Sequence, residues 1–561
     1  MPLPFQHRAA DPQAAAELGR AVGVGPTVGQ LLLHRGLVEP EAARAFLSPR
    51  LRDLTPPDGM IDRDLAADRL ARAVRAGERI AVFGDYDVDG VTSAAILGDV
   101  LEALGGDVVT LAGNRFEGGY GFSREALQRC REAGVKVIVT CDCGSSDHER
   151  IVEARRDGID VIVVDHHLVP EEPLPALAFV NPHRPECAHP YKHMASAGLA
   201  FSIAAALRQR LHADLDVRPW LDLVAVGTIA DMAPLDGDNR RLARAGLERI
   251  ARGAARPGLL ALMRAARLEA GAPVTARDVG WRLGPRLNAP GRLGSAQDAL
   301  DLLRARDAAS AERLAARLEE ANRLRRRLGE RALREADAMA RGRRAAGAAG
   351  ALVVAGEGWH RGVTGIVAGR LARMHGVVVA VVALDGDFGY GSVRSAGGVD
   401  VHGALGRCAS LLERWGGHRG AGGFTVRRSR LGDFRAAFEA AAAAEGAEPE
   451  RLTVDVVLDG QHFPVPGAAE LSRLEPFGEG NGEPLFAVRE ATVERLWRPK
   501  DGLHLAMELR VGSQRLRAFG PRLGEMADRF ERAEALVGRL QPDTWRGGEH
   551  LQLLLEAPGE R

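Results

Sequence analysis

The chain passes from an apolar run into a cluster of carboxylates at Ile80-Ala81-Val82-Phe83-Gly84-Asp85-Tyr86-Asp87-Val88-Asp89-Gly90. The apolar part is short, β-branched and followed by glycine, which is typical of a buried strand. Three carboxylates within five residues repel one another unless they share a cation. In extended backbone, Asp87 and Asp89 would point the same way because they lie two residues apart. An EF-hand loop begins similarly, but its twelfth position is Ile96 here rather than the glutamate that Ca²⁺ requires.

The same alternation continues to about residue 235. Further apolar runs occupy 108–111, 135–140 and 161–164, and helical stretches lie at 94–104, 123–133 and 149–157. Buried β runs separated by helices predict an α/β fold, a parallel sheet with right-handed crossovers.

Polar groups follow three more apolar stretches. Asp142 follows 135–141, Asp165-His166-His167 follows 161–164, and Asp231 follows 221–230. Loops at the carboxyl ends of parallel strands share one crevice, so we expect these groups to converge and Asp231 to complete the set. Taken singly, each is more typical of a helix cap or a surface side chain; together they favour a metal site. Carboxylates with imidazoles suit Mg²⁺ or Mn²⁺, and this many ligands is enough for two metal ions about 4 Å apart.

Four segments resemble the signature motifs of the DHH phosphoesterase superfamily: Gly84–Gly90, Cys141–Gly144, Asp165–His167 and Gly227–Asp231. The residues around the first and last are similar to the exonucleases of that superfamily that act on single-stranded DNA. The resemblance implies metal ligands at Asp87, Asp89, Asp142, His166 and Asp231, with Asp142 as the bridging ligand. It implies further that His167 contacts the scissile phosphate and that Asp85 and Asp165 orient their neighbours or assist the second metal. Cys141, where an aliphatic residue is more usual, is interpreted as apolar strand filler.

Two arginine-containing segments are candidate substrate contacts. Residues 114–121 combine a cation, an aromatic ring and glycines, and supply Arg115 and Tyr120. Residues 282–292 place three arginines and an asparagine in what we expect to be a rigid, turn-rich segment; they supply Arg282, Arg286, Asn288 and Arg292. Both segments resemble the same exonucleases, although Pro290 stands where a small residue is usual. One such arginine would be ordinary surface, whereas three around a turn favour phosphate contact.

A second alternating region, about 350–440, contains three glycine-rich segments at 358–365, 392–395 and 416–423. The first joins an expected strand to a helix, whose free N–H groups suit an anion. The ordered trio resembles the DHH-associated domain, and by that resemblance His360, Arg394, Ser395 and His418 contact substrate phosphate or sugar.

Five regions are expected along the chain. They are a helical N-terminal extension (1–75), a DHH catalytic domain (76–240), a helical region ending in a long connector helix (241–345), a smaller α/β DHH-associated domain (346–445) and a C-terminal OB-like β-barrel (452–561). In the last, β-like runs lie at 454–458, 491–497, 504–511, 515–519 and 551–555. Its candidate base-stacking side chains are Phe486, Trp497 and Phe519, for each of which core packing is the competing interpretation. A linker is expected at 440–450.

Composition excludes several classes. The 561 residues carry 75 basic and 75 acidic side chains, which argues against a chain that coats nucleic acid by bulk charge. Only three basic residues are lysines, and none stands in a Walker A loop. The five cysteines form no C-x-x-C pair, which suits a reducing compartment. No signal peptide is visible, and the longest apolar run, 377–384, is too short to span a bilayer. We therefore expect a cytoplasmic protein, with a narrow positive groove at the local arginine clusters.

The resemblance implies a metal-dependent 5′→3′ exonuclease that hydrolyses single-stranded DNA to 5′-mononucleotides in DNA repair and recombination, with two Mn²⁺ or Mg²⁺ ions. It also implies single-strand-binding protein and a RecQ-type helicase as partners, and we expect a monomer without membrane contact. Two alternatives are another DHH-superfamily phosphodiesterase, acting on short oligonucleotides or cyclic dinucleotides, and a non-catalytic single-strand-binding subunit. The N-terminal extension and OB-like tail argue against the first, and the complete ligand set argues against the second.

Overall fold

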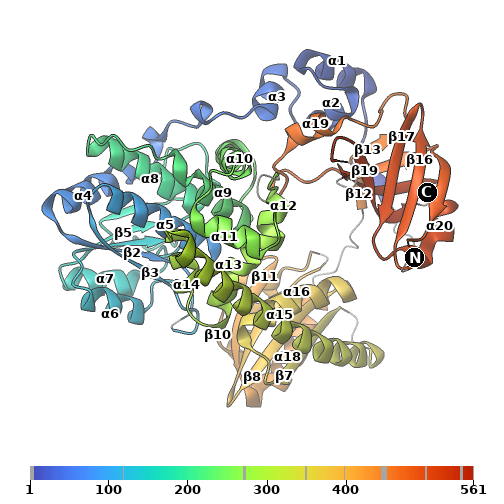
Figure 1. The fold of residues 1–561 in the computed structure, drawn as a ribbon. Helices are drawn as coiled ribbons and strands as arrows, with labels where there is room; N and C mark the ends of the chain where they lie inside the picture. Colours follow the sequence, from blue (N-terminus) through green and yellow to red (C-terminus); the bar gives the residue numbers. More distant parts are fainter. Residues whose placement is uncertain are drawn as a thin grey trace. The chain divides into compact units, whose positions relative to one another are not determined.

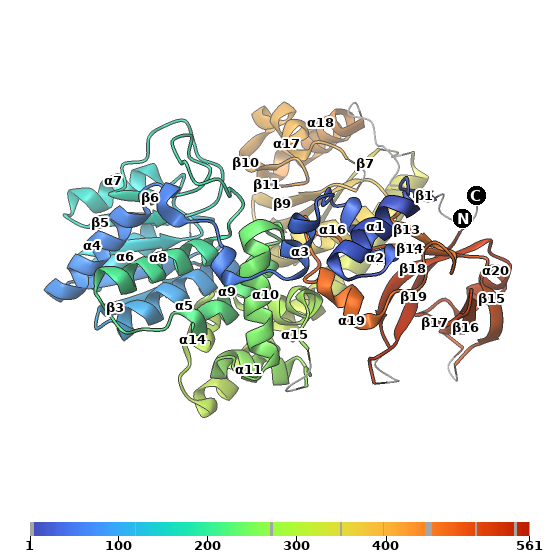
Figure 2. The same cartoon turned by 90° about the horizontal axis from the view of Figure 1, so that it is seen from above.

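A computed structural model describes residues 5–117, 119–269, 273–347, 350–396, 398–443, 452–499, 502–543 and 547–559. Figures 1 and 2 show its helices and strands. The chain divides into two compact units. Unit 1 comprises residues 1–284, 300–311 and 451–561, and unit 2 comprises residues 285–299 and 312–450. Each is described by itself.

The predicted parallel sheet is present in unit 1. Its strand order is β3-β2-β4-β5-β6, with every neighbouring pair parallel, and the strands are β2 (Arg79–Gly84), β3 (Asp107–Ala112), β4 (Val137–Cys141), β5 (Asp160–Val164) and β6 (Ala178–Val180). Strands β2, β4 and β5 are almost wholly buried, because helices cover both faces. The strand ends therefore bring their loops to one edge, as the sequence predicts.

Alternate residues of each strand face different helices. Phe83 and Ile138 join the apolar cluster that includes Leu127 and Ile151, on α6 (Arg124–Glu132) and α7 (His148–Arg156). The opposite face carries α4 (Arg63–Ala76), α5 (Val88–Ala103) and α8 (Ser196–Arg210), as Figure 1 shows.

Further helices complete this part of unit 1 and lead to unit 2. They are α9 (Leu221–Ala230), α10 (Gly237–Ala251), α11 (Pro257–Ala265), α12 (Ala276–Asp278), the π-helix η4 (Val279–Leu283), α13 (Gly284–Leu293) and α14 (Gln297–Arg304), with short 3-10 turns at η1 (Leu51–Asp53), η2 (Pro57–Gly59) and η3 (Arg218–Trp220). The segment 282–292, expected to be a rigid turn, is instead helical, with Pro290 inside α13. Helix propensity does not explain this, because proline and glycine are the least favourable residues in a helix interior. Leu283, Leu287 and Ala289 are buried, so tertiary packing favours the helix.

The predicted connector helix is α15 (Ala308–Ala345). In unit 2 its C-terminal half packs apolar side chains against a mixed sheet of order β10-β11-β9-β8-β7. The strands are β7 (Ala351–Glu357), β8 (Val378–Asp385), β9 (Phe388–Arg394), β10 (Leu412–His418) and β11 (Ala421–Arg427); the helices are α16 (Thr364–His375), α17 (Val401–Arg407) and α18 (Leu431–Ala443), with turns η5 (Arg361–Val363), η6 (Ala409–Leu411) and η7 (Arg428–Arg430). The linker expected at 440–450 lies mostly outside the described residues.

The C-terminal region forms a sheet of order β13-β14-β18-β19-β17-β16-β15. These strands are β13 (Val456–Leu458), β14 (Phe486–Arg489), β15 (Thr492–Trp497), β16 (Leu505–Val511), β17 (Gln514–Gly520), β18 (Ala535–Pro542) and β19 (Leu551–Gly559), accompanied by α19 (Ala468–Leu471), η8 (Ser472–Leu474), η9 (Gly524–Met526) and α20 (Ala527–Glu531). Two of these strands are not apparent from the sequence: β14, which is short, and β18, in which glycine and arginine interrupt the apolar pattern.

The N-terminal helices share the core of this sheet. These helices are α1 (Pro12–Val22), α2 (Pro26–Leu33) and α3 (Pro40–Leu47). Leu18 and Leu31 lie in one apolar cluster with Leu474 and Leu509. In addition, β1 (Phe5–His7) pairs in parallel with β12 (Leu452–Val454). Segments about 450 residues apart in sequence therefore form one structural module. Among the described residues, no helix combines the length and apolar character needed to cross a membrane.

Candidate metal centre

The loop after β2 carries the first carboxylates, but the extended backbone that we expected ends at Asp87, where α5 begins. Asp87 is the N-cap of α5, with its side chain accepting a hydrogen bond from Gly90 N at 3.1 Å, and Asp89 lies in the first helical turn. The Asp87 carboxylate stabilises the start of α5 because it accepts a hydrogen bond from a backbone N–H group that has no partner within the helix. A Cβ on Gly90 would lie 2.5 Å from Asp85 N, so the loop closes this tightly only with glycine.

The second and third motifs follow β4 and β5. Asp142 adopts a left-handed backbone conformation, with φ of 62°. Asp165 is fully buried and held by four hydrogen bonds, from the N–H groups of Ser145, His166 and His167 and from His167 Nδ1 at 2.7 Å. This network fixes the orientation of the His167 imidazole and holds the backbone at His166.

The fourth motif reaches the centre from a helix. Residues 221–230 form α9 rather than a strand, and Asp231 is its C-cap. A buried helix and a buried strand are both continuously apolar, so periodicity alone did not separate them. Asp231 nevertheless joins the cluster: its Oδ2 lies 3.5 Å from His166 Nε2, which is also 3.2 Å from Asp142 Oδ1 and 3.9 Å from Asp89 Oδ2.

Candidate ligand atoms form three overlapping groups, each within a 4.8 Å span. The groups are Asp142–His166–His167, Asp89–His166–Asp231 and Asp85–Asp87–Asp142. Asp142 and His166 each belong to two of these groups. Asp85, expected to orient its neighbours or to assist the second metal, lies among the candidate ligands.

The electrostatics of the cluster fit bound cations. Burial, followed by repulsion from neighbouring carboxylates, raises the pKa of Asp89 to about 7 and that of Asp231 to about 9, and raises the pKa of Asp85 and Asp142 well above the usual range. Burial and the neighbouring His167 lower the pKa of His166 to about 4, which leaves its imidazole neutral at pH 7. Its Nε2 is buried and lacks a hydrogen-bond partner among the described residues. Crowded carboxylates beside an unpartnered neutral imidazole nitrogen are a donor set suited to Mn²⁺ or Mg²⁺.

His167 lies in a different environment. Burial would lower its pKa, but the hydrogen bond to Asp165 and that residue's charge raise it to about 9. Burial alone would raise the pKa of Asp165, yet the same bond holds it below the usual range. The Tyr120 hydroxyl lies 3.0 Å from His167 Nδ1 and donates to Asp142 O at 3.2 Å. The side chain of His167 is 44% exposed, so a cationic imidazole faces solvent beside the carboxylates.

Two of the predicted substrate residues of unit 1 lie in contrasting places. The Arg115 guanidinium stacks on the Tyr86 ring at 4.2 Å, and its charge partly offsets the rise that burial and Asp87 produce in the pKa of Asp85. Arg282 instead donates to the carbonyl oxygens of Ala266 and Arg267, both at 2.7 Å, and so braces the helical region. Sequence patterns do not distinguish these two uses of arginine.

The predicted substrate residues of α13 lie in unit 2. Arg286 donates to Glu319 Oε2 at 2.7 Å, Asn288 is half-buried, and Arg292 Nη1 is 3.5 Å from Gly362 O.

The glycine-rich segments of unit 2 gather at one sheet edge. Arg394 ends β9, and Ser395 N donates to Gly420 O at 3.3 Å, which places both beside the β10–β11 turn that carries His418. A Cβ on Gly365, in the first turn of α16, would lie 3.2 Å from Arg394 Nη2. His360 Nδ1 accepts from Gly362 N at 3.1 Å in the turn before that helix.

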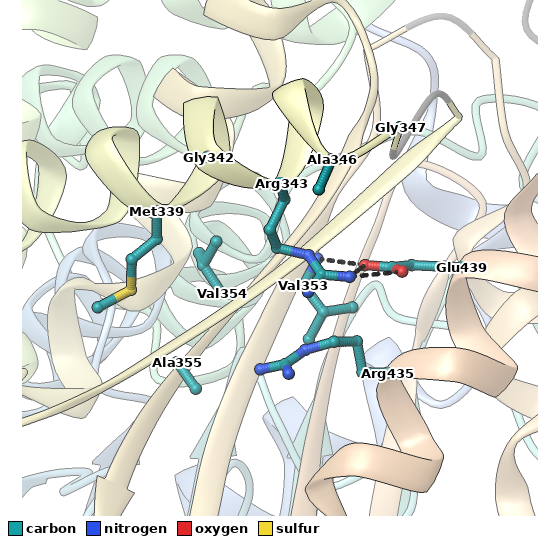
Figure 3. A pocket seen from close by; sticks show the side chains of 10 residues that line it. All are labelled: Met339, Gly342, Arg343, Ala346, Gly347, Val353, Val354, Ala355, Arg435 and Glu439. Atoms are coloured by element: carbon teal, nitrogen blue, oxygen red, sulfur yellow. Dashed lines mark hydrogen bonds and ion pairs between the residues drawn. The ribbon is translucent and has the colours of Figure 1, made fainter.

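A pocket of about 630 Å³ lies elsewhere in unit 2, away from all of these residues (Figure 3). Its polar wall is the two-pronged ion pair of Arg343 with Glu439, with both Nη2–O distances at 2.7 Å. This pair links α15 to α18, and Glu439 also accepts from Val353 N on β7 at 3.3 Å. We assign the pair an architectural part in holding the connector helix.

Sequence reasoning missed the groups that hold the ligands in place. The amides of Ser196 and Ala197 donate to Asp89, and Asn181 Nδ2 donates to His167 O at 2.9 Å. None of them stands in a motif, and the spatial contacts arise only from the fold.

Comparison with family models matches three parts of this architecture. Residues 79–228 match the DHH family, N-terminal domain; residues 348–444 match the DHHA1 domain; and residues 454–557 match the RecJ OB domain. By fold and by metal centre the chain is a DHH phosphoesterase.

Individual relatives of the chain identify its family within this class. The chain is 33% identical over 558 residues to the single-stranded-DNA-specific exonuclease RecJ of Bacillus subtilis, covering 97% of this chain and 69% of that protein. It is also 33% identical over 558 residues to RecJ of Escherichia coli, covering 95% of each. The crystal structure of RecJ from Thermus thermophilus in complex with Mn²⁺ superimposes with a TM-score of 0.80 at 33% identity, over 99% of this chain and 78% of that one. The Mg²⁺ complex of the same protein gives a TM-score of 0.75 at 32% identity, over 99% of this chain and 77% of that one. The chain belongs to the RecJ family of single-stranded-DNA-specific exonucleases.

Proposed function

We propose that this exonuclease hydrolyses single-stranded DNA from the 5′ end and releases 5′-mononucleotides. The observation that carries the proposal is the convergence of five aspartates and two histidines from four separate motifs, in a chain of the RecJ family. The 5′→3′ polarity and the mononucleotide product come from the motif resemblance.

We propose that two divalent ions, Mn²⁺ or Mg²⁺, bind to Asp87, Asp89, Asp142, His166 and Asp231, with Asp85 as an additional candidate ligand. When bound, the ions supply Lewis acidity and charge neutralisation for phosphodiester hydrolysis. The overlapping ligand groups and the buried, unpartnered Nε2 of His166 support this assignment.

His167 is proposed to contact the scissile phosphate. With Nδ1 oriented by Asp165 at 2.7 Å, the opposite ring nitrogen is the one presented to a ligand. The raised pKa of His167 keeps the imidazolium form at neutral pH, and that cation stabilises negative charge on a phosphate oxygen. Asp165 thus acts by orienting and charging the imidazole.

Contacts along the DNA strand are proposed for Arg115 and Tyr120 in unit 1, and for the α13 and glycine-rich segments in unit 2. Among these residues, Arg394 is the best candidate for a phosphate contact. Its guanidinium is buried, which lowers its pKa, and Nη1 donates to Val393 O at 2.7 Å. The other guanidinium N–H groups can donate to a phosphate. Arg282 and Arg286 are already engaged with protein groups, so an additional DNA contact by them requires the remaining guanidinium donors.

The test uses single strands labelled at either the 5′ or the 3′ end, incubated with Mn²⁺. We expect the 5′ label to appear first as a mononucleotide, and Asp142→Ala to lose release by more than about 10³-fold because it removes the shared ligand. Earlier release of the 3′ label would contradict the polarity, and equal release by the variant would contradict the metal centre.

In the cell we propose a cytoplasmic role in DNA repair and recombination, together with single-strand-binding protein and a RecQ-type helicase. Pull-down of each purified partner, with and without single-stranded DNA, tests these associations. Recovery of neither partner would contradict them without affecting the nuclease assignment.

A further inference from the structure

The carboxylate of Asp89 is held by the start of another helix. Its Oδ2 accepts from Ser196 N at 2.7 Å and its Oδ1 accepts from Ala197 N at 3.0 Å. These are the first two amides of α8, whose N-cap residue, Ala195, makes no side-chain capping bond. Asp89 therefore takes the place of a capping side chain, and the helix dipole strengthens both bonds.

A glycine on α9 closes the cage around this carboxylate. A Cβ on Gly227 would lie 2.8 Å from Asp89 Oδ1 and 2.4 Å from Thr92 Oγ1. No real side chain fits at such distances, so α9 approaches Asp89 this closely only because residue 227 is glycine. The carboxylate is thus immobilised from two sides.

The side chain of Ser196 reaches a second carboxylate. Its Oγ donates to Asp142 Oδ1 at 3.1 Å, and the residue is fully buried. The same oxygen of Asp142 lies 3.2 Å from His166 Nε2. Asp142 stands in a loop after β4, outside any helix or strand, so this hydroxyl supplies an orientation that the backbone element does not.

We propose that Ser196 is a positioning residue that joins two metal ligands: its amide holds Asp89 and its hydroxyl holds Asp142. It sets their separation in the folded chain before a metal binds. The hydroxyl occupies one lone pair of Asp142 Oδ1 and leaves the others for a cation. Prearranged ligands lose less conformational freedom on binding, and groups that orient ligands typically contribute about 10–100-fold to metal affinity. The proposal rests on the proposed metal centre.

The test compares Mn²⁺ binding by the metal-free full-length wild type, Ser196→Ala and a matched control, Ser93→Ala. Ser93 lies on α5 and is equally buried, but its Oγ has no hydrogen-bond partner among the described residues. Calorimetry gives the dissociation constant, and Mn²⁺ EPR counts free ions independently of activity. We expect Ser196→Ala to raise the dissociation constant about 10–100-fold and Ser93→Ala to stay within about twofold of wild type.

A purely structural role predicts something else: a lower melting temperature for Ser196→Ala with an unchanged Mn²⁺ dissociation constant. That result, or an equal loss of affinity in Ser93→Ala, would overturn the proposal. If Ser196→Ala does not fold, Ser196→Cys replaces it, because a thiol is a weak donor of similar shape and should weaken binding in the same direction. Failure of the wild type to bind Mn²⁺ would refute the metal centre itself, whereas tight binding by both wild type and variant refutes only the part assigned to Ser196.

Discussion

The aspartates of the centre hold protons in the absence of metal. The pKa values of about 7 for Asp89 and about 9 for Asp231 exceed the usual value near 4, chiefly because of burial. Both groups bind protons more tightly in the folded than in the unfolded chain. Their contribution to stability is therefore complete below about pH 4 and is lost as the pH rises through 7 and then 9. A bound cation replaces these protons.

Metal affinity should consequently rise with pH. Between pH 6.5 and 8.5 we expect Mn²⁺ binding to tighten by about tenfold per pH unit for each proton released. Calorimetry in two buffers of different ionisation enthalpy counts those protons, and Asp231→Asn should release fewer. Affinity that is independent of pH, with no proton release, would show that these carboxyls are already ionised.

The adjacent histidines should differ in what they contribute. His166 is neutral, buried and surrounded by carboxylates, so His166→Ala should raise the Mn²⁺ dissociation constant at least about tenfold. His167 is cationic and partly exposed, so His167→Ala should keep Mn²⁺ affinity within a few-fold and lower kcat about 10²–10³-fold. The paired measurements are Mn²⁺ titration and nuclease turnover at saturating metal. An equal loss of metal by His167→Ala would instead make it a ligand.

At the scale of elements, Arg240 on α10 links three segments of unit 1. It is 2% exposed and donates to Phe46 O, Arg473 O and Pro476 O at 3.1–3.4 Å. Its guanidinium also stacks on the Phe46 ring at 3.8 Å. Burial and the neighbouring Arg244 lower its pKa to about 9. This cation connects the helices beside the metal centre to the N-terminal and C-terminal module.

Replacing Arg240 should therefore destabilise unit 1. Arg240→Met removes one donor from three carbonyl groups, of which Arg473 O and Pro476 O keep Arg244 Nη1 and Asn481 Nδ2 as donors. Together with the lost stacking on Phe46, this should lower the free energy of unfolding by about 1–3 kcal/mol in urea denaturation. Arg252→Met is the control: that side chain, at the C-terminal end of the same helix, is 78% exposed and should change stability by less than about 0.5 kcal/mol. Equal effects in the two variants would contradict the linking function.

At the scale of the whole molecule, the N-terminal helices and the C-terminal sheet form one module. Leu18 and Leu31 share its apolar cluster, and Arg35 donates to Asn481 Oδ1 at 2.8 Å. Deleting residues 452–561 would expose the apolar faces of α1 and α2, so loss of activity in such a truncation would not report on DNA binding alone. Point substitutions on the sheet test its function more directly.

Trp497 is the best candidate on this sheet for stacking on a nucleobase. Phe486 is fully buried and serves the core, whereas Trp497 is half-buried with Arg495 at 5.0 Å and Arg517 at 5.9 Å from its ring. Because one stacked base contributes about 1–3 kcal/mol, Trp497→Ala should raise KM for a long single strand about 5–100-fold and leave cleavage of a very short oligonucleotide unchanged. Leu503→Ala is the control, because the Leu503 residue is 57% exposed. Equal effects on long and short substrates would contradict a DNA-holding function for the sheet.

Sequence alone was sufficient to recognise the parallel sheet, the long helix, the OB-like tail and the aspartates and histidines that the fold brings together. Short apolar runs that end in carboxylates predict strands followed by polar loops. Parallel strands bring those loops together at one edge of the sheet. The same reasoning placed Asp231 after a strand and residues 282–292 in a turn, and it was wrong in both cases because a continuously apolar or glycine-rich stretch does not reveal its backbone geometry.

Only the tertiary structure revealed which groups hold the cluster in place. The amides and hydroxyl of α8 that bind Asp89 and Asp142 come from more than 50 residues away in sequence, and the partners of Leu18 and Arg35 lie about 450 residues away. Such contacts produce no periodic pattern in the sequence, because the burial of a serine hydroxyl or a leucine depends on which residues the fold places next to it. Local pattern therefore specifies the ligands and the elements, and long-range packing specifies how rigidly they are held.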